Sequence, residues 1–368
     1  MHVLITGGAG FLGSHVARRL IGHGMSVRIL DNLSEQVHGG VSYPDYLPSG
    51  LELLVGDVRD RPLVETALDG IDAVVHLAAA VGVGQSMYEA VHYTSVNELG
   101  TATLLQAMAD RGIERLVCAS SMSIYGEGEY HDAQGHPVDV GERDIEQLRR
   151  RDWEPRHDGR MLIPVPTTER KVPSLSSIYA LNKFAQERMC LTLGRAYDIP
   201  TVALRFFNIY GRDQALSNPY TGVLAIFASR ILNGRPPLIF EDGQQRRDFV
   251  HVSDAANACS LALTTSDGVG GAYNIGSGVG RTVLETAHDL ATVMGRPDME
   301  PRITGKFRAG DIRHCFADIS KARAFLGYEP RTCFEDGLAD LADWLRTQAA
   351  TDRVEQAMDE LHRRGLVA

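Results

Sequence analysis

Two side chains that could transfer a proton together lie four residues apart in the segment SSIYALNK. Tyr179 and Lys183 share one face of the helix that we predict over Ser177–Ala196, because residues four apart on a helix are neighbours. A tyrosine hydroxyl has an ordinary pKa of about 10, so it acts as a base near neutral pH only where positive charge lowers that pKa. The lysine ammonium supplies such a charge. The spacing therefore indicates a tyrosine base with a lysine partner.

A third member of this catalytic set, a side chain with a hydroxyl group, is expected at the end of a neighbouring strand. The segment CASSMSIYG runs on from the strand candidate Arg115–Ser120 and contains Ser120, Ser121 and Ser123. A serine at this edge of a sheet could share a hydrogen bond with the tyrosine hydroxyl. The residues alone leave the choice among the three serines open.

Glycines form a GxxGxxG motif, Gly7, Gly10 and Gly13, directly after an apolar strand candidate and at the start of a predicted helix. Glycine permits a tight turn and the close approach of a pyrophosphate, and the helix N-terminus supplies free N–H groups. Asp31 ends the next strand candidate, where a carboxylate accepts hydrogen bonds from both adenosine ribose hydroxyls and repels a 2′-phosphate. We therefore expect a dinucleotide site that holds NAD, whose charged nicotinamide ring would also lower the tyrosine pKa.

Two further polar residues are expected at the same edge of the sheet. Asp57 follows the third strand candidate and is placed to meet the adenine edge, although a carboxylate that only caps the strand end would give the same pattern. Asn97, in the segment NELGT of a long predicted helix, would support Lys183 through a water molecule. Both predictions place side chains around the dinucleotide.

Short apolar runs alternate with helical patterns through the first half of the chain. The strand candidates are His2–Thr6, Ser26–Asp31, Leu51–Val55, Ala73–Leu77, Arg115–Ser120 and Thr201–Arg205, and the helical stretches are Phe11–Gly24, Pro62–Leu68, Ser86–Asp110 and Ser177–Ala196. Consecutive apolar residues are typical of parallel strands covered on both faces. We predict an α/β fold with a Rossmann-type doubly wound parallel sheet. Right-handed crossovers bring the carboxyl ends of its strands to one edge, where a ligand binds.

The second half predicts a smaller C-terminal α/β lobe that binds substrate. Its helical stretches are Thr221–Asn233, Ser253–Thr265, Thr282–Met294, Ser320–Leu326 and Phe334–Gln348, and residues 352–364 carry a packing stripe. We expect an NAD-binding domain over residues 1–205 and a lobe over residues 206–368 that is interwoven with it. Residues 127–172 are polar and irregular, which predicts a long functional or mobile loop.

Composition excludes several classes of protein. The 368 residues carry a net charge of −10, which argues against a nucleic-acid partner or an anionic membrane surface. No apolar stretch approaches the roughly 18 residues of a membrane span, and the N-terminus reads as a strand and not as a signal peptide. The five cysteines lack any CxxC spacing, so we expect free thiols in a reducing cytoplasm and no metal site.

Ordered motifs along almost the whole chain resemble those of the extended short-chain dehydrogenase/reductase family, in particular its nucleotide-sugar epimerases and dehydratases. They are TGGAGFLGSH, DN at 31–32, GDV at 56–58, HLAA at 76–79, SSMSIYG, YALNK, LRFFNIYG, RRDFVHVSD and RAGDIR. The resemblance implies that Ser121 is the catalytic hydroxyl beside Tyr179 and Lys183. It extends the cofactor-binding set to Gly7, Gly10, Phe11, Leu12, Gly13, Asp31, Asn32, Asp57, Val58, Leu77, Ala78, Ala79, Asn97, Tyr179 and Lys183. The implied substrate-binding residues are Ser121, Ser123, Asn208, Arg247, Arg308 and Asp311, with the two arginines on a diphosphate.

The resemblance also bears on the reaction. The family's 4,6-dehydratases carry an Asp-Glu pair after the catalytic hydroxyl, and its decarboxylases carry a Glu in the same stretch, whereas Met122 and Ser123 stand here. We therefore expect a 4-epimerase of a dTDP- or UDP-linked hexose with tightly held NAD, most similar to the dTDP-L-rhamnose 4-epimerase-like and UDP-sugar 4-epimerase group. An NAD(P)H-dependent 4-ketoreductase would share every catalytic residue. A non-catalytic dinucleotide-binding scaffold is disfavoured by the intact Ser121, Tyr179 and Lys183.

Three further expectations follow from the resemblance. A homodimer would form through the long helix near Ser86–Asp110 and the Tyr179 helix, in a four-helix bundle. The group often carries a cysteine pair in the long insertion, where this chain reads WEPRHDGR. Cys315 lies where residue size gates the sugar pocket in some epimerases, and simple packing explains a cysteine there equally well.

Overall fold

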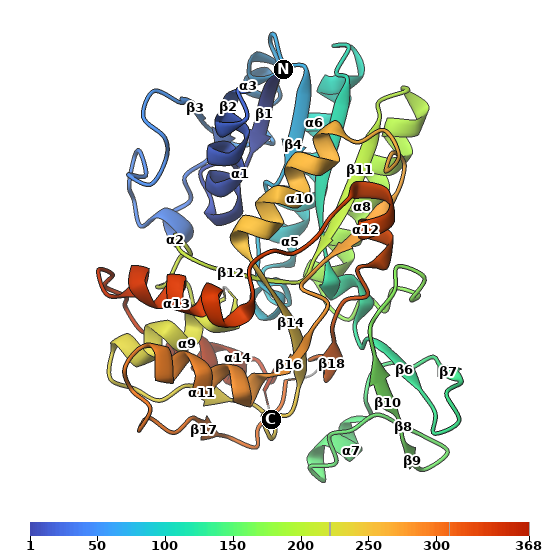
Figure 1. Ribbon diagram of the computed structural model, residues 1–368, viewed down its shortest axis with the longest axis vertical. Helices are drawn as coiled ribbons and strands as arrows, with labels where there is room; N and C mark the ends of the chain where they lie inside the picture. Colours follow the sequence, from blue (N-terminus) through green and yellow to red (C-terminus); the bar gives the residue numbers. More distant parts are fainter. Residues whose placement is uncertain (221, 309, 368) are drawn as a thin grey trace.

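The computed structural model describes residues 1–220, 222–308 and 310–367 and centres on a seven-stranded parallel sheet (Figure 1). In spatial order the strands are β15 (Ala272–Ile275), β11 (Thr201–Phe206), β5 (Arg115–Ser121), β4 (Ala73–His76), β1 (His2–Thr6), β2 (Ser26–Asp31) and β3 (Glu52–Val55). The chain winds outward in both directions from β1, and every pairing is parallel. The predicted doubly wound α/β fold is confirmed, with its topological switch point between β1 and β4.

Helices cover both faces of this sheet because the strands are apolar at consecutive positions. Val3 and Ile5 pack with α1 (Phe11–Gly22) and α10 (Val252–Thr264), whereas Leu4 between them faces the other side. That side is covered by α3 (Arg61–Ala67), α6 (Gly100–Ala109) and α8 (Ile178–Ala196). Side chains alternate between the faces of a strand, so each strand contributes to two cores.

The strand β15 is absent from the sequence prediction, which had six strands. Its four residues, AYNI, include a polar asparagine and lie far along the chain from the other strands, so no local pattern marks them as part of the sheet. The helix α12 (Ser320–Leu326) packs beside it. The central sheet thus takes its edge strand from beyond residue 205.

The long helix predicted over Ser86–Asp110 is continuous only from Ala90 to Ala109, with a π-helical turn inside it and a separate short helix before it. The structure has α4 (Val83–Ser86), α5 (Ala90–Thr94), a π-helical turn over Ser95–Leu99 and then α6. Within the turn, Asn97 exchanges two hydrogen bonds with the peptide of Ala80, at 2.7 and 3.1 Å. A π-helical turn is common at functional sites, and here it joins the helix to the loop after β4.

The C-terminal half, apart from α10, β15 and α12, forms a smaller lobe below the sheet in Figure 1. Helices α9 (Val223–Leu232), α11 (Val283–Val293) and α13 (Phe334–Leu345) share one apolar core. The small sheets contain β12 (Asn208–Tyr210), β14 (Arg246–His251), β16 (Gly280–Thr282) and β18 (His314–Cys315), and β13 (Leu238–Ile239) with β17 (Arg302–Ile303). The predicted start of the first helix, Thr221, lies outside the described residues. The packing stripe is present in α14 (Val354–Arg363), where Leu361 is buried.

The insertion is structured, which corrects the expectation of an irregular loop. Strands β6 (Glu129–His131), β7 (Pro137–Val138) and β10 (Ile163–Val165) form an antiparallel sheet, accompanied by α7 (Ile145–Arg149) and the hairpin of β8 (Arg156–His157) and β9 (Arg160–Met161). These elements make the lower right corner of Figure 1. Their strands are too short and too polar for an apolar alternation to reveal them.

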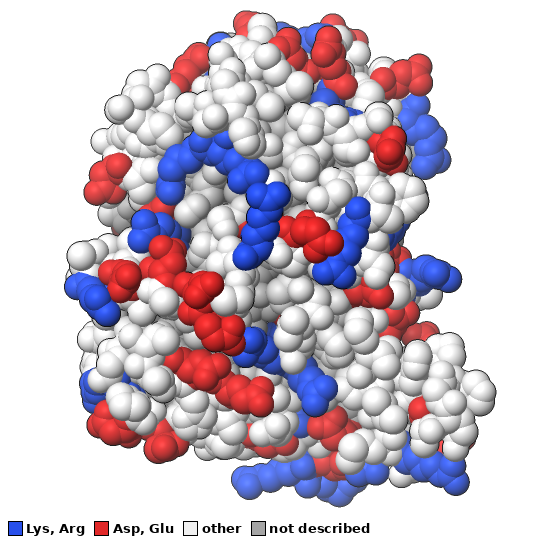
Figure 2. Space-filling view, viewed as in Figure 1, with Lys and Arg blue, Asp and Glu red and all other residues white. Residues whose placement is uncertain are grey.

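The surface mixes charges of both signs. Figure 2 shows acidic and basic side chains side by side over most of the face in view. In the described part of the chain, no helix combines the length and apolar character needed to cross a lipid bilayer.

Candidate active site

Gly7 and Gly13, in the turn between β1 and α1 and just after it, are packed too tightly for a side chain. Gly7 has a positive φ of 69°, and a Cβ there would lie 2.7 Å from the amide nitrogen of Ala78. A Cβ on Gly13 would lie 2.4 Å from the carbonyl oxygen of Gly7 and 2.5 Å from Cα of Gly8. Gly10 caps the helix without a side-chain hydrogen bond, so the first N–H groups of α1 stay available. The turn is a backbone cradle of the kind that holds a pyrophosphate.

Asp31 is held beside this cradle at the end of β2. Its carboxylate accepts hydrogen bonds from the amides of Ala9 at 3.0 Å and Leu33 at 2.9 Å. Two residues that belong to no recognised motif complete its surroundings. Tyr46 donates a hydrogen bond of 2.8 Å to the carbonyl of Ala9, and the His38 ring lies 3.7 Å from the Asp31 carboxylate. A carboxylate fixed by backbone amides keeps further lone pairs for ribose hydroxyls.

Asp57 has a partner that the sequence prediction did not include. Arg59 binds its carboxylate through two hydrogen bonds of 2.7 Å, and the Asn32 amide lies at 3.4 Å. The hydrogen bonds from Arg59 hold the pKa of Asp57 down at about 2, against the opposing effect of burial. The neighbouring Val58 is a core residue packed against Gly100. Asp57 and Asn32 therefore lie together near β3, with the carboxylate ionised and paired.

The structure distinguishes the three serines after β5. Ser120 is buried and donates to Glu187 at 2.6 Å. Ser121 accepts a hydrogen bond of 2.9 Å from Ser123 and acts on Tyr179, whose pKa it lowers. Because successive strand residues point to opposite faces, only one of the adjacent pair can face the tyrosine. The choice of Ser121 fits this geometry.

Tyr179 lies in the first turn of α8, which Ser177 caps by accepting a hydrogen bond from the amide of Ala180. Burial raises the pKa of Tyr179 to about 12, and the hydrogen bond with Ser121 opposes this rise. Burial lowers the pKa of Lys183 to about 8, which leaves the ammonium charged at neutral pH. In these surroundings the tyrosine is protonated, so its work as a base requires added positive charge beside it.

A buried hydrogen-bond chain fixes the lysine. Lys183 donates to the Gln186 side-chain oxygen at 2.8 Å, and the Gln186 amide donates to the Thr101 hydroxyl at 2.8 Å. Thr101 donates in turn to a backbone carbonyl at 2.5 Å, so Nε2 of His76, at 2.9 Å, must be the donor to Thr101. Nδ1 of His76 then accepts from Thr6 at 2.7 Å. No local sequence pattern predicts this series of hydrogen bonds, because the residues that form it are far apart in sequence.

Asn97 is held by hydrogen bonds to the protein backbone. Its side chain is occupied by the Ala80 peptide, as described above, and its carbonyl is the acceptor for Thr101. A direct hydrogen-bonded path links the Asn97 carbonyl to Lys183 through Thr101 and Gln186.

His76 makes the stability of the protein depend on pH. Burial, with a further contribution from Lys183, lowers the pKa of His76 to about 3. The unfolded chain binds a proton at about pH 6.5, so the stability due to the neutral ring is lost as pH falls from 6.5 toward 3. We expect the unfolding free energy of the wild type, relative to His76→Gln, to fall by about 1 kcal/mol between pH 7 and pH 5.5. Urea unfolding at both pH values measures this, and an identical pH dependence in the two proteins would contradict it.

The predicted diphosphate arginines meet at one carboxylate. Arg308 binds Asp311 at 3.0 Å, and Arg247 lies 3.8 Å from the same side chain. Burial would raise the pKa of Asp311, but the charges of Arg308 and Arg247 hold it below its ordinary value. The Arg308 guanidinium also lies over the ring of Phe240, at 4.5 Å. The structure thus gathers these three predicted substrate residues in one place.

Asn208 and Cys315 lie on the small sheets beside these arginines. The Asn208 side-chain oxygen is buried without a hydrogen-bond partner, so it is free to meet a polar ligand. Cys315 is buried, pairs in register with Arg247, and has its sulfur 3.8 Å from the Thr167 hydroxyl. Burial raises the pKa of this thiol to about 12, so it stays protonated.

The remaining predicted cofactor residues surround the cradle. Phe11 and Leu12 begin α1, and Phe11 stacks edge-to-face on His15. Leu77, Ala78 and Ala79 follow β4, and the Leu77 amide donates to the carbonyl of Thr6 at 3.0 Å. The predicted residues therefore gather at the carboxyl ends of β1, β2 and β4, on either side of the switch point.

A model of the NAD dependent epimerase/dehydratase family matches residues 3–143 and 159–276. The chain belongs to this family. The dTDP-L-rhamnose 4-epimerase of Burkholderia thailandensis is 35% identical over 347 residues, which span 93% of this chain and 94% of that protein. The family expected from the sequence is thereby confirmed.

Solved structures of family members agree with this assignment. The UDP-glucose 4-epimerase of Thermotoga maritima, solved with UDP-glucose, has a TM-score of 0.77 and 30% identity, covering 94% of this chain and 99% of that one. The UDP-glucose 4-epimerase of Thermus thermophilus, solved with NAD, has a TM-score of 0.74 and 31% identity, covering 95% of this chain and 100% of that one. NAD is the cofactor, as predicted, and the glycine-rich cradle at Gly7–Gly13 with Asp31 beside it fits that dinucleotide.

Proposed function

We propose that the protein is an NAD-dependent nucleoside-diphosphate-sugar 4-epimerase that acts on a dTDP- or UDP-linked hexose through a transient 4-keto sugar. The observation that supports this most strongly is the placement of Ser121 at the carboxyl end of β5, next to Tyr179 and the buried Lys183 on α8. The three relatives named above are 4-epimerases of dTDP- or UDP-linked sugars, in agreement with this reaction.

The proposed mechanism assigns each side chain one task. Tyr179, with Ser121 hydrogen-bonded to its side chain, takes the proton from the 4-hydroxyl of the sugar and later returns one. Lys183 favours the ionised tyrosine by its charge. When bound, NAD accepts a hydride from carbon 4 and supplies it again. Arg247 and Arg308 hold the diphosphate while the sugar turns over, so that hydride returns to the opposite face.

The absence of an acid after Ser121 argues against elimination of water from the sugar. Met122 and Ser123 follow it, and the next carboxylate in sequence is Glu127. That group is buried and accepts a hydrogen bond of 2.7 Å from Tyr130, so it is engaged in the structure of the insertion. Oxidation and reduction at carbon 4 need no such acid.

A 4-ketoreductase is distinguished from the epimerase by its use of cofactor. The purified protein is extracted with acid to measure bound NAD, and is incubated with dTDP- and UDP-hexoses without added cofactor. Turnover on copurified NAD, without accumulation of NADH, supports the epimerase. If a 4-keto sugar were reduced only on addition of NAD(P)H, in stoichiometric amount, the protein would be a reductase and the proposal wrong.

We also propose a homodimer through the α5 and α8 surface. Val91 on α5 is 87% exposed, and Leu99 and Leu181, on the π-helical turn and on α8, are 56% and 45% exposed. Apolar side chains left in water on adjoining helices are typical of a subunit interface. We expect light scattering after size-exclusion chromatography to give twice the mass of the chain, and Leu181→Glu to shift the protein toward monomer. A monomeric wild-type protein at micromolar concentration would exclude this interface.

A further inference from the structure

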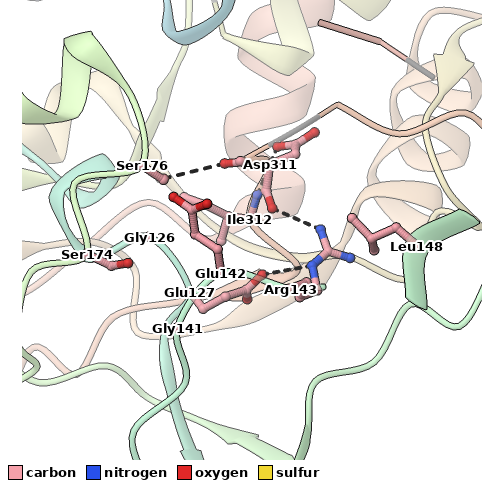
Figure 3. Close-up of a pocket in the computed structure, with 11 residues that line it drawn as sticks. Gly126, Glu127, Gly141, Glu142, Arg143, Leu148, Ser174, Ser176, Asp311 and Ile312 are labelled. Atoms are coloured by element: carbon pink, nitrogen blue, oxygen red, sulfur yellow. Dashed lines mark hydrogen bonds and ion pairs between the residues drawn. The ribbon is translucent and has the colours of Figure 1, made fainter. Parts of the chain in front are cut away.

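A small cavity lies between the segments that carry the catalytic hydroxyls (Figure 3). Gly126, on one side, directly follows the 3₁₀ turn Met122–Tyr125, which begins next to Ser121. Ser174 and Ser176, on another side, come just before Tyr179. In sequence, residues that line the cavity therefore stand within a few positions of both Ser121 and Tyr179.

The third side of the cavity comes from the insertion and from the diphosphate-binding segment. Glu142 and Arg143 enter from the insertion, at the end of the first matched segment of the family. Asp311 and Ile312 enter from the segment that carries the substrate arginines. The cavity of about 20 Å³ has room for one water molecule, and hence for one small exocyclic substituent of a sugar.

The positive charge at this cavity is already neutralised. The Arg143 side chain is only 2% exposed, and its guanidinium lies 3.1 Å from Glu127 and 2.7 Å from Glu241. It also donates to the backbone carbonyl of Asp311 at 2.9 Å. The Arg143 guanidinium is thus fully paired with protein groups and is not available to a negatively charged ligand.

Glu142, unlike Arg143, has no charged partner among the described residues. Within residues 1–220, 222–308 and 310–367, no hydrogen bond or ion pair engages its carboxylate. The residue remains open to solvent, and Figure 3 shows its carboxylate on the Ser176 side of the cavity. Among the described residues, the cavity is therefore lined by one unpaired carboxylate, the arginine-paired carboxylates of Glu127 and Asp311, and two serine hydroxyls.

We infer that Glu142 determines substrate specificity, by admitting a neutral, hydroxyl-bearing substituent of the sugar and rejecting a carboxylate. A hydroxyl group donates a hydrogen bond to the Glu142 oxygen, whereas a second carboxylate is repelled and finds no free cation at Arg143. The substrate class is then a neutral hexose and not a uronic acid. This inference rests on the proposed function and narrows its substrate.

Binding to the NAD-loaded protein tests the inference separately from turnover. Titration calorimetry with UDP-glucose and UDP-glucuronate gives the ratio of the two dissociation constants. We expect UDP-glucuronate to bind at least about tenfold more weakly to the wild type, and Glu142→Gln to reduce that ratio to about threefold or less. Glu146→Gln is the matched control, because this carboxylate lies on α7 and pairs with Arg149. It should leave the ratio unchanged.

Each outcome bears on one of the two claims. Equal binding of both sugars by the wild type, or an unchanged ratio in Glu142→Gln, would overturn the role of Glu142 and leave the proposed function intact. If neither of these UDP-sugars nor a dTDP-linked hexose bound to the NAD-loaded protein, the proposed function itself would fail. Binding with the expected ratio but without epimerisation would contradict the reaction and not the subsite.

Discussion

Tyr179→Phe is expected to lower kcat by about 10³-fold while NAD content, KM and thermal stability stay near those of the wild type. The change removes one oxygen, the group that takes the proton from the sugar, and a general base contributes roughly 10²–10⁴ in rate. Phenylalanine keeps the ring that packs at the start of α8. Steady-state kinetics with the preferred nucleotide sugar, together with acid extraction of NAD, measure the effect.

Tyr197→Phe is the control for this variant. Tyr197 caps the other end of the same helix and is 54% exposed, so loss of its hydroxyl should leave kcat unchanged. Near-normal turnover by Tyr179→Phe would mean that another group takes the proton. A parallel loss of NAD would indicate that the hydroxyl also holds the cofactor, as its place in the cofactor-binding set implies, and kcat would then be compared per bound NAD.

Gly13→Ala is expected to reduce the NAD bound per chain by at least about tenfold. Its Cβ would lie 2.4 Å from the carbonyl oxygen of Gly7 and 2.5 Å from Cα of Gly8. Both contacts are with backbone, so the turn itself must move, at a typical cost of about 1–3 kcal/mol. A displaced turn no longer presents its amides to the pyrophosphate. Absorbance of the acid extract gives NAD content, and thermal unfolding reports stability.

Gly22→Ala separates a local effect from the general effect of alanine in this helix. Gly22 lies at the end of α1, and a Cβ there meets no atom within 4 Å. The substitution should keep NAD and add up to about 1 kcal/mol of stability through helix propensity. Full NAD content in Gly13→Ala would refute the role of the turn as the pyrophosphate cradle.

Local patterns were sufficient to predict the elements that carry the chemistry. Consecutive apolar residues marked β1 and β4, and the glycine spacing marked the turn at Gly7–Gly13, because these features depend on residues close in sequence. The position of Tyr179 and Lys183 on α8 followed from helical periodicity for the same reason.

Features that depend on contacts between residues far apart in the chain could not be predicted from the sequence. The chain from Lys183 through Gln186 and Thr101 to His76 joins three separate segments, and nothing near any one residue indicates it. The edge strand β15 is defined by pairing with β11, some 70 residues earlier. The ion pair of Asp57 with Arg59 was near in sequence but depends on side-chain rotamers, which periodicity does not specify.

The central claim is that the hydride removed from carbon 4 returns to the same sugar. A UDP- or dTDP-hexose labelled with deuterium at carbon 4 is incubated with the purified protein, without added cofactor, and the epimer is analysed by mass spectrometry and NMR. The account predicts an epimer that keeps the deuterium at carbon 4. An epimer with hydrogen at that position, or deuterium found in NADH released to solution, would contradict it.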